Sequence, residues 1–225
     1  TDNGTNWDNV TSPTTNHLYG VAFGNNTFVG VGNKGNIVKS NDNGINWDNA
    51  TSPTANVLYK VTFGNNTFVA VGNSGNIVRS TDNGINWDNA TSSTGNHLWG
   101  VTFANNTFVA VGNSGNIVRS TDNGSSWDNA TSPTGNYFDE VTFGNNTFVA
   151  VGEGGIIVKS TDNGASFNNV TSPTTNDLWG VTFGNNTFVG VGRDGNIVRS
   201  TDNGINWDNA TSPTWRHLLG VTYLE

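Results

Sequence analysis

The chain repeats itself every forty residues. The segment Ser80-Thr81-Asp82-Asn83-Gly84-Ile85-Asn86-Trp87 returns almost unchanged, with an aromatic residue five positions after each aspartate. A fixed period of this length is typical of solenoids, propellers and other repeat arrays, in which each unit packs against the next. Each forty-residue unit is therefore expected to form one complete supersecondary motif.

Three turn signals divide each unit into short β-rich runs. Gly64-Asn65-Asn66 and Asn73-Ser74-Gly75-Asn76 indicate hairpin turns, and Asp82-Asn83-Gly84 indicates a third turn. The turns separate four predicted strands, over residues 58–63, 67–72, 76–80 and 85–90. Four short strands per unit match a propeller blade. A β-solenoid is the structural alternative, but its coils are usually shorter and lack three hairpin turns.

We therefore predict one all-β domain over residues 1–225, a β-propeller with five complete four-stranded blades. The unit boundaries are 1–16, 17–56, 57–96, 97–136, 137–176, 177–216 and 217–225, the first and last being partial. A lone fourth strand (5–10) and a lone first strand (218–223) remain at the two ends. In a five-bladed ring, one of these ends is surplus or exchanged between chains. In a six-position ring, which we favour, the two strands pair as a reduced sixth blade and hide sheet edges.

The pattern Ser-x-Asp-x-Gly-x-x-Trp resembles the Asp-box (BNR) repeat of sialidases, sortilin-type receptors and photosystem-stability-factor-like bacterial propellers. The resemblance covers the whole chain, beginning with Asp2 and Trp7, and implies the fold rather than a function. In that family the Asp box is a structural turn between the third and fourth strands. The resemblance thus implies a structural role for Asp42, Gly44, Trp47, Asp82, Gly84, Trp87, Asp122, Gly124, Trp127, Asp162, Gly164, Phe167, Asp202, Gly204 and Trp207.

The charge of the chain argues against several partners. With 17 acidic and 9 basic residues the net charge is −8, and no basic run exists, so we expect neither nucleic-acid nor anionic-membrane binding. No apolar run approaches the roughly 18 residues of a membrane span. Cysteine is absent, which excludes disulfides and thiol chemistry. The sequence does not specify a compartment, although a secreted or cell-surface location is favoured.

Catalytic and metal sites find little support. Sialidase chemistry, in that family, needs an arginine trio, whereas the basic residues here mostly occupy one repeat position (Lys39, Arg79, Arg119, Lys159 and Arg199) and are spread around the ring. Tyr137 with Glu140 is the only near match to the nucleophile pair of that family. The Asp-Asn-Gly turn lacks the twelve-residue ligand pattern of an EF-hand. We expect no enzyme activity, no cofactor and no metal.

Differences between the units gather in two places: the connection from one blade to the next, and the turn between the second and third strands. In a four-stranded blade both lie on the same face, where propellers usually bind ligands. The candidate ligand-binding residues are His17, Tyr19, Tyr59, His97, Trp99, Tyr137, Trp179, Arg193 and Asp194. Aromatic rings beside amide and hydroxyl groups suit carbohydrate. The competing interpretation is that loops vary freely and that the aromatic residues pack between blades.

We therefore predict a non-catalytic binding or scaffold propeller, with glycans bound at shallow repeated pockets as the leading hypothesis. Equivalent weak pockets around a ring raise avidity. The alternative is a structural or protein-interaction repeat, including self-association through the terminal strands. The near-identity of the units also fits an engineered or recently amplified propeller with no evolved ligand.

Overall fold

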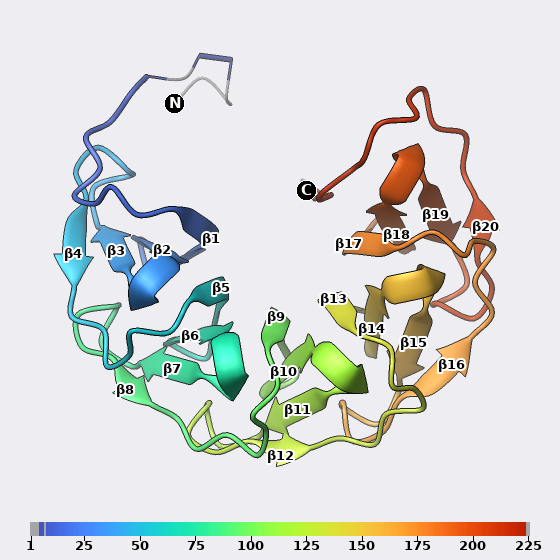
Figure 1. Ribbon diagram of the computed structural model, residues 1–225, viewed down its shortest axis with the longest axis horizontal. Coiled ribbons are helices and arrows are strands. Elements are labelled where there is room, and N and C mark those ends of the chain that lie inside the picture. Colours follow the sequence, from blue (N-terminus) through green and yellow to red (C-terminus); the bar gives the residue numbers. More distant parts are fainter. Residues whose placement is uncertain (1–4, 7, 224–225) are drawn as a thin grey trace.

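The computed structural model describes residues 5–6 and 8–223. Their strands form five four-stranded antiparallel sheets, each with its strands in chain order, and we call each sheet a blade (Figure 1). The first blade contains β1 (Leu18–Gly24), β2 (Thr27–Gly32), β3 (Ile37–Ser40) and β4 (Asp48–Ala50). The second contains β5 (Leu58–Gly64), β6 (Thr67–Gly72), β7 (Ile77–Ser80) and β8 (Asp88–Asn89). The third contains β9 (Leu98–Ala104), β10 (Thr107–Gly112), β11 (Ile117–Ser120) and β12 (Asp128–Asn129).

The fourth blade contains β13 (Phe138–Gly144), β14 (Thr147–Gly152), β15 (Ile157–Ser160) and β16 (Asn168–Val170). The fifth contains β17 (Leu178–Gly184), β18 (Thr187–Gly192), β19 (Ile197–Ser200) and β20 (Asp208–Asn209). Short 3₁₀ turns join the second and third strands: η1 (Asn33–Gly35), η2 (Asn73–Gly75), η3 (Asn113–Gly115), η4 (Glu153–Gly155) and η5 (Arg193–Gly195). The predicted all-β class and five complete units are confirmed.

The blades stand around a common centre. The first strands β1, β5, β9, β13 and β17 lie innermost, and the fourth strands form the outer rim (Figure 1). The resulting arc is open, because a wide gap separates the first blade from the fifth. None of the described residues belongs to a helix long and apolar enough to cross a membrane.

The turn chemistry explains the strand boundaries. Asn65 and Asn66 have φ values of 47° and 58°, which gives the two-residue hairpin turn that joins β5 to β6. Asn83 and Gly84 also have positive φ, at 60° and 76°, inside the Asp box. The fourth strand is shorter than the predicted 85–90, because the Asp box occupies the residues that precede β8.

The Asp box is held by its own side chains. The Ser80 hydroxyl donates to Asp82 Oδ1 at 2.8 Å and accepts from the Gly84 amide at 2.9 Å. The Asn86 amide donates to Asp82 Oδ1 at 2.9 Å. The Trp87 indole N–H donates to the Gly84 carbonyl at 3.1 Å, which fixes the ring against the neighbouring blade. Asp2 and Trp7, from the first copy of this motif, lie outside the described residues.

The hydrophobic core lies between blades rather than within them. Val29, Val31 and Ile37 of the first blade pack against Leu58, Phe68 and Trp87 of the second, and all six are buried. Three further clusters repeat this arrangement at the later junctions. Each blade therefore has a leading face, which contacts the blade before it, and a trailing face, which contacts the blade after it.

The described residues do not confirm the two predicted terminal strands, and residue 7 of the first one lies outside them. Neither the described residues of 5–10 nor residues 218–223 are assigned to a strand, and the two segments do not pair as a reduced sixth blade. In each complete blade the first strand is hydrogen-bonded to the second and the fourth strand to the third. Residues 218–223 nevertheless lie against β17, since a Cβ placed on Gly180 would be 3.1 Å from the Gly220 Cα.

Candidate functional site

A β-bulge at the start of each first strand turns one side chain out of the sheet. In the second blade Leu58 pairs with Gly72 and Lys60 with Val71, which leaves Tyr59 unpaired. A bulge re-aims the side chain that it carries. Leu58 is fully buried, whereas Tyr59 reaches the adjacent turn and its hydroxyl contacts Asn73 Oδ1 at 3.3 Å. The same bulge occurs in every blade.

The two regions where the units differ are the connection between blades and the turn between the second and third strands. Their backbones pack closely against each other, which brings both regions to one face. A Cβ on Gly72 would lie 1.9 Å from the Val57 carbonyl oxygen, and one on Gly75 would lie 1.9 Å from the Thr94 carbonyl oxygen. Gly75 also has a φ of 68°, which favours glycine. The η2 turn is thus clamped between the connection that enters its blade and the one that leaves it.

Three of the re-aimed aromatic residues form a continuous surface, which we call the aromatic strip: Tyr19, Tyr59 and Trp99. The ring centroids of Tyr19 and Tyr59 are 6.0 Å apart, and those of Tyr59 and Trp99 are 4.2 Å apart. The Trp99 indole N–H donates to Asn113 Oδ1 at 2.6 Å, which fixes the ring. Each of these ring contacts joins neighbouring blades, and Tyr59 and Trp99 are half-buried.

The aromatic strip ends in a shallow pocket lined by Trp99, Asn113, Tyr137 and Asp139. Burial, together with the nearby carboxylates of Asp177, Glu140 and Glu153, raises the pKa of Asp139 to about 7. Glu153 also raises the pKa of the Tyr137 phenol. The pocket therefore combines two aromatic rings, an amide and a carboxyl group within an acidic environment.

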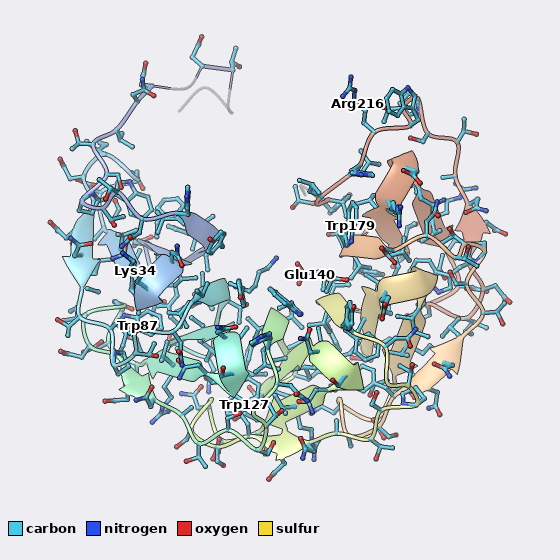
Figure 2. All side chains as sticks on the ribbon, in the orientation of Figure 1. Lys34, Trp87, Trp127, Glu140, Trp179 and Arg216 are labelled. Carbon is cyan, nitrogen blue, oxygen red and sulfur yellow. The ribbon has the colours of Figure 1, made fainter. Side chains whose placement is uncertain are left out.

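An ion pair crosses the inner edge of the arc beside this pocket. Lys60 Nζ of β5 contacts Glu140 Oε2 of β13, two blades further along the chain. Gly100 of β9 lies between them in the same repeat position, and a Cβ there would be 3.1 Å from Glu140 Oε1. Figure 2 shows Glu140 directed toward the centre. Burial raises the pKa of Glu140, although the Lys60 ammonium opposes the shift.

Tyr137 and Glu140 do not form the sialidase-like pair that the sequence hinted at. Glu140 is engaged by Lys60, and the carboxylate that most affects Tyr137 is that of Glu153. The described residues contain no group of three or more His, Asp or Glu side chains arranged to hold a metal ion.

The remaining candidate residues lie elsewhere on the same face. His97 Nδ1 accepts a hydrogen bond from the Ser74 amide at 2.9 Å, so this nitrogen holds the η2 turn. Trp179 lies at the far end of the arc, with its ring edge-on to His217 at 5.2 Å between centroids (Figure 2). Arg193 and Asp194 are exposed at the same end, with 3.7 Å between Arg193 Nε and Asp194 Oδ2. His17 lies 6.5 Å from Tyr19, next to the aromatic strip.

No model of a known protein family matches the sequence, and no curated protein does either. Solved structures do match. YCF48 bound to a D1 peptide, which is a β-propeller, has a TM-score of 0.73 and 19% identity, over 92% of this chain and 72% of that one. The chain has the β-propeller fold. Its repeats are Asp-box-like, as the sequence pattern implied.

Two further propellers show how widely the fold is used. The computationally designed Ika8 protein has a TM-score of 0.71 and 13% identity, over 92% of this chain and 65% of that one. The GH74 enzyme of Niastella koreensis has a TM-score of 0.65 and 21% identity, over 88% of this chain and 32% of that one. Identities this low establish the propeller architecture and carry no site residues.

Asn113, Asp139, Lys60 and Glu140 lie in or beside the pocket but were not among the candidate ligand-binding residues. Lys60, Asp139 and Glu140 do belong to the region where the units differ from one another. One signal was available: the repeat position of Lys60 and Glu140 is glycine in the other units, at Gly20, Gly100, Gly180 and Gly220. When two units carry opposite charges at a repeat position that is glycine in all the others, a contact between the two charged residues is indicated.

Proposed function

We propose that this propeller is a non-catalytic binding module whose ligand lies along the aromatic strip and in the adjoining pocket, and that the ligand is a carbohydrate. The observation that carries the proposal is the convergence of Trp99, Asn113, Tyr137 and Asp139 on one pocket. Aromatic rings stack on the apolar faces of sugars, while amide and carboxyl groups hydrogen-bond to their hydroxyls.

The pocket differs from its repeat equivalents, which favours one binding site over a ring of equal ones. Trp99 is hydrogen-bonded to Asn113, whereas the position equivalent to Asn113 in the fifth blade is Arg193. Trp179 therefore shares the bulge position of Trp99 without its amide partner. This difference provides a matched pair of tryptophans for testing.

A second candidate ligand is a peptide that carries a cationic side chain. The specific observation in its favour is the group of carboxylates around Asp139, which adds to burial in raising the pKa of that residue. A bound ammonium or guanidinium group would relieve the repulsion between these carboxylates. One of the similar structures, YCF48, is described with a D1 peptide bound.

The test is a glycan-array screen of the purified protein together with Trp99→Ala, Trp179→Ala and Asp139→Asn. We expect binding that Trp99→Ala abolishes and Trp179→Ala preserves. Equal loss in both tryptophan variants would indicate repeated pockets instead of one.

A peptide array read in parallel distinguishes the two ligand classes. Retention of lysine- or arginine-containing peptides that Asp139→Asn abolishes would favour the peptide. A folded protein that binds neither glycans nor peptides would contradict a ligand-binding role and support a scaffold.

A further inference from the structure

The leading face of the first blade is uncovered. Leu18 and Val21 are 43% and 65% exposed, whereas their equivalents in the second blade, Leu58 and Val61, are 0% and 3% exposed. Together with Trp47 and Gly30, Leu18 and Val21 line an open apolar groove. Every later blade buries this same face against the blade before it. The groove is therefore half of a contact that the chain makes four times elsewhere.

The opposite half of that contact lies at the other end of the arc. Val189, Val191 and Ile197 form the trailing face of the fifth blade, in the positions of Val29, Val31 and Ile37. Val29 and Ile37 are fully buried by the second blade, but Val189 and Ile197 stay partly exposed. The segment 218–223 lies in the position where a further blade would begin.

The register of the interior junctions shows which residues lack partners. A Cβ on the Asp-box glycine of each later blade would touch the Cγ2 of a valine 55 residues earlier: Gly84 with Val29, Gly124 with Val69, Gly164 with Val109 and Gly204 with Val149, all within 3.4 Å. Gly44 has no such valine, since only its own Trp47 comes within 4.0 Å. Val189 is the next valine of the series, and the glycine it needs is the repeat equivalent of Gly44.

We propose that a second copy of this chain docks head-to-tail, with the leading face of one copy on the trailing face of the other. The junction reproduces the interior contact residue by residue, so that Val189 of one copy packs at Gly44 of the other. The groove is shaped for the valine and isoleucine ridge of a preceding blade. The chain carries one such ridge that no complete blade covers, on the trailing face of the fifth blade, and this identifies the occupant. The two ends of a single arc lie apart (Figure 1), so the ridge of the fifth blade does not reach the groove of the same arc.

The segment 218–223 covers part of the trailing face, where the first strand of a further blade would lie, and we call it the placeholder. Its sequence, Leu-Leu-Gly-Val-Thr-Tyr, closely follows Leu-Tyr-Gly-Val-Ala-Phe of residues 18–23. Tyr223 lies over Gly184 as Phe63 lies over Gly24. Among the described residues no second strand follows the placeholder, whereas β1 of a second copy is already paired with β2. Exchange of the placeholder for a whole blade therefore adds buried apolar surface without changing the register.

Such an interface joins two different surfaces, so it is not limited to dimers. Head-to-tail contacts generate rings when their rotation closes and filaments when it does not. We expect the association to be concentration-dependent and driven mainly by apolar burial.

The test is sedimentation velocity over a concentration series on the full chain. We expect the wild type to form dimers and larger species, and Val21→Glu to remain monomeric. Ile205→Glu is the matched control: Ile205 is 58% exposed, comparable to Val21, but it lies on an Asp-box loop outside both faces. Circular dichroism confirms that each variant is folded, and Phe23→Glu on the same leading face replaces Val21→Glu if that variant is not.

Mixing two defective variants makes the test specific to a head-to-tail contact. Val21→Glu lacks a usable leading face and Val189→Glu lacks a usable trailing face, so a mixture retains one intact junction. The mixture should stop at dimers while each variant alone stays monomeric. The proposal is overturned if the wild type is monomeric at every concentration, whether its arc is open or its two ends close on each other. It is also overturned if Val21→Glu assembles to the same extent as the wild type.

Discussion

Lys60 and Glu140 form an ion pair across the inner edge of the propeller, over the bare backbone of Gly100. The pair ties the second blade to the fourth, and the third blade stands between them. It also borders the pocket that contains Asp139. The space for it exists because Gly100 carries no side chain at this position.

Removing one partner of this pair should destabilise the protein more than removing both. Lys60→Ala leaves the Glu140 carboxylate buried without its counter-charge, which we expect to cost about 1–3 kcal/mol because Lys60 is partly open to solvent. The double variant Lys60→Gly with Glu140→Gly restores the residue found in the other units, and should lose less than Lys60→Ala. Denaturant unfolding measures both values. A double variant less stable than Lys60→Ala would contradict this account.

Because the core lies between blades, tryptophans at equivalent repeat positions should contribute unequally to the free energy of unfolding. Trp87 is buried between two blades, whereas Trp47 faces the uncovered groove of the first blade. Trp87→Ala should cost about 3–5 kcal/mol, as expected for a large buried aromatic residue. Trp47→Ala should cost clearly less. Equal losses in denaturant unfolding would show that the exposed end is covered under the conditions of the measurement, for example by a second copy.

The Asp-box carboxylates should make the protein sensitive to acid. The backbone N–H of Asn206 and the side chains of Asn206 and Ser200 hold the pKa of Asp202 at about 2, below its ordinary 3.8, and Asp42 behaves likewise. Because the folded pKa is lowered, this stabilisation is complete above about pH 4 and is lost as the pH falls toward 2. Unfolding free energies measured from pH 5 to pH 2 should fall less steeply for Asp202→Asn. An identical slope would rule out this role.

Asp139 should have the opposite effect on stability. Its pKa is raised to about 7, chiefly by burial, so the folded protein holds a proton that the unfolded chain has already released. The stabilisation is therefore complete below about pH 4 and is lost as the pH rises through 7. Asp139→Asn should flatten the stability profile over this range. NMR titration of the Asp139 carboxyl carbon checks the pKa directly.

Much of this propeller follows from its sequence, because the decisive signals are local. Asn65 and Asn66 take the positive φ values of a tight hairpin turn, and Asp82 bonds the amides of its own loop. Such features need only a few consecutive residues. Repetition at a fixed period then implies that each unit stacks on the next in the same way, which identifies the blade and its core.

The tertiary structure decided what depends on contacts between units. The β-bulge turned Tyr59 onto Trp99, which alternation along a strand does not predict. Lys60 and Glu140 are 80 residues apart in sequence and meet because Gly100 leaves room between them. The terminal segments matched the strand pattern, yet none of their described residues lies in a strand. A repeat determines what each unit offers to the next, but only the folded arc shows which of those surfaces remain uncovered.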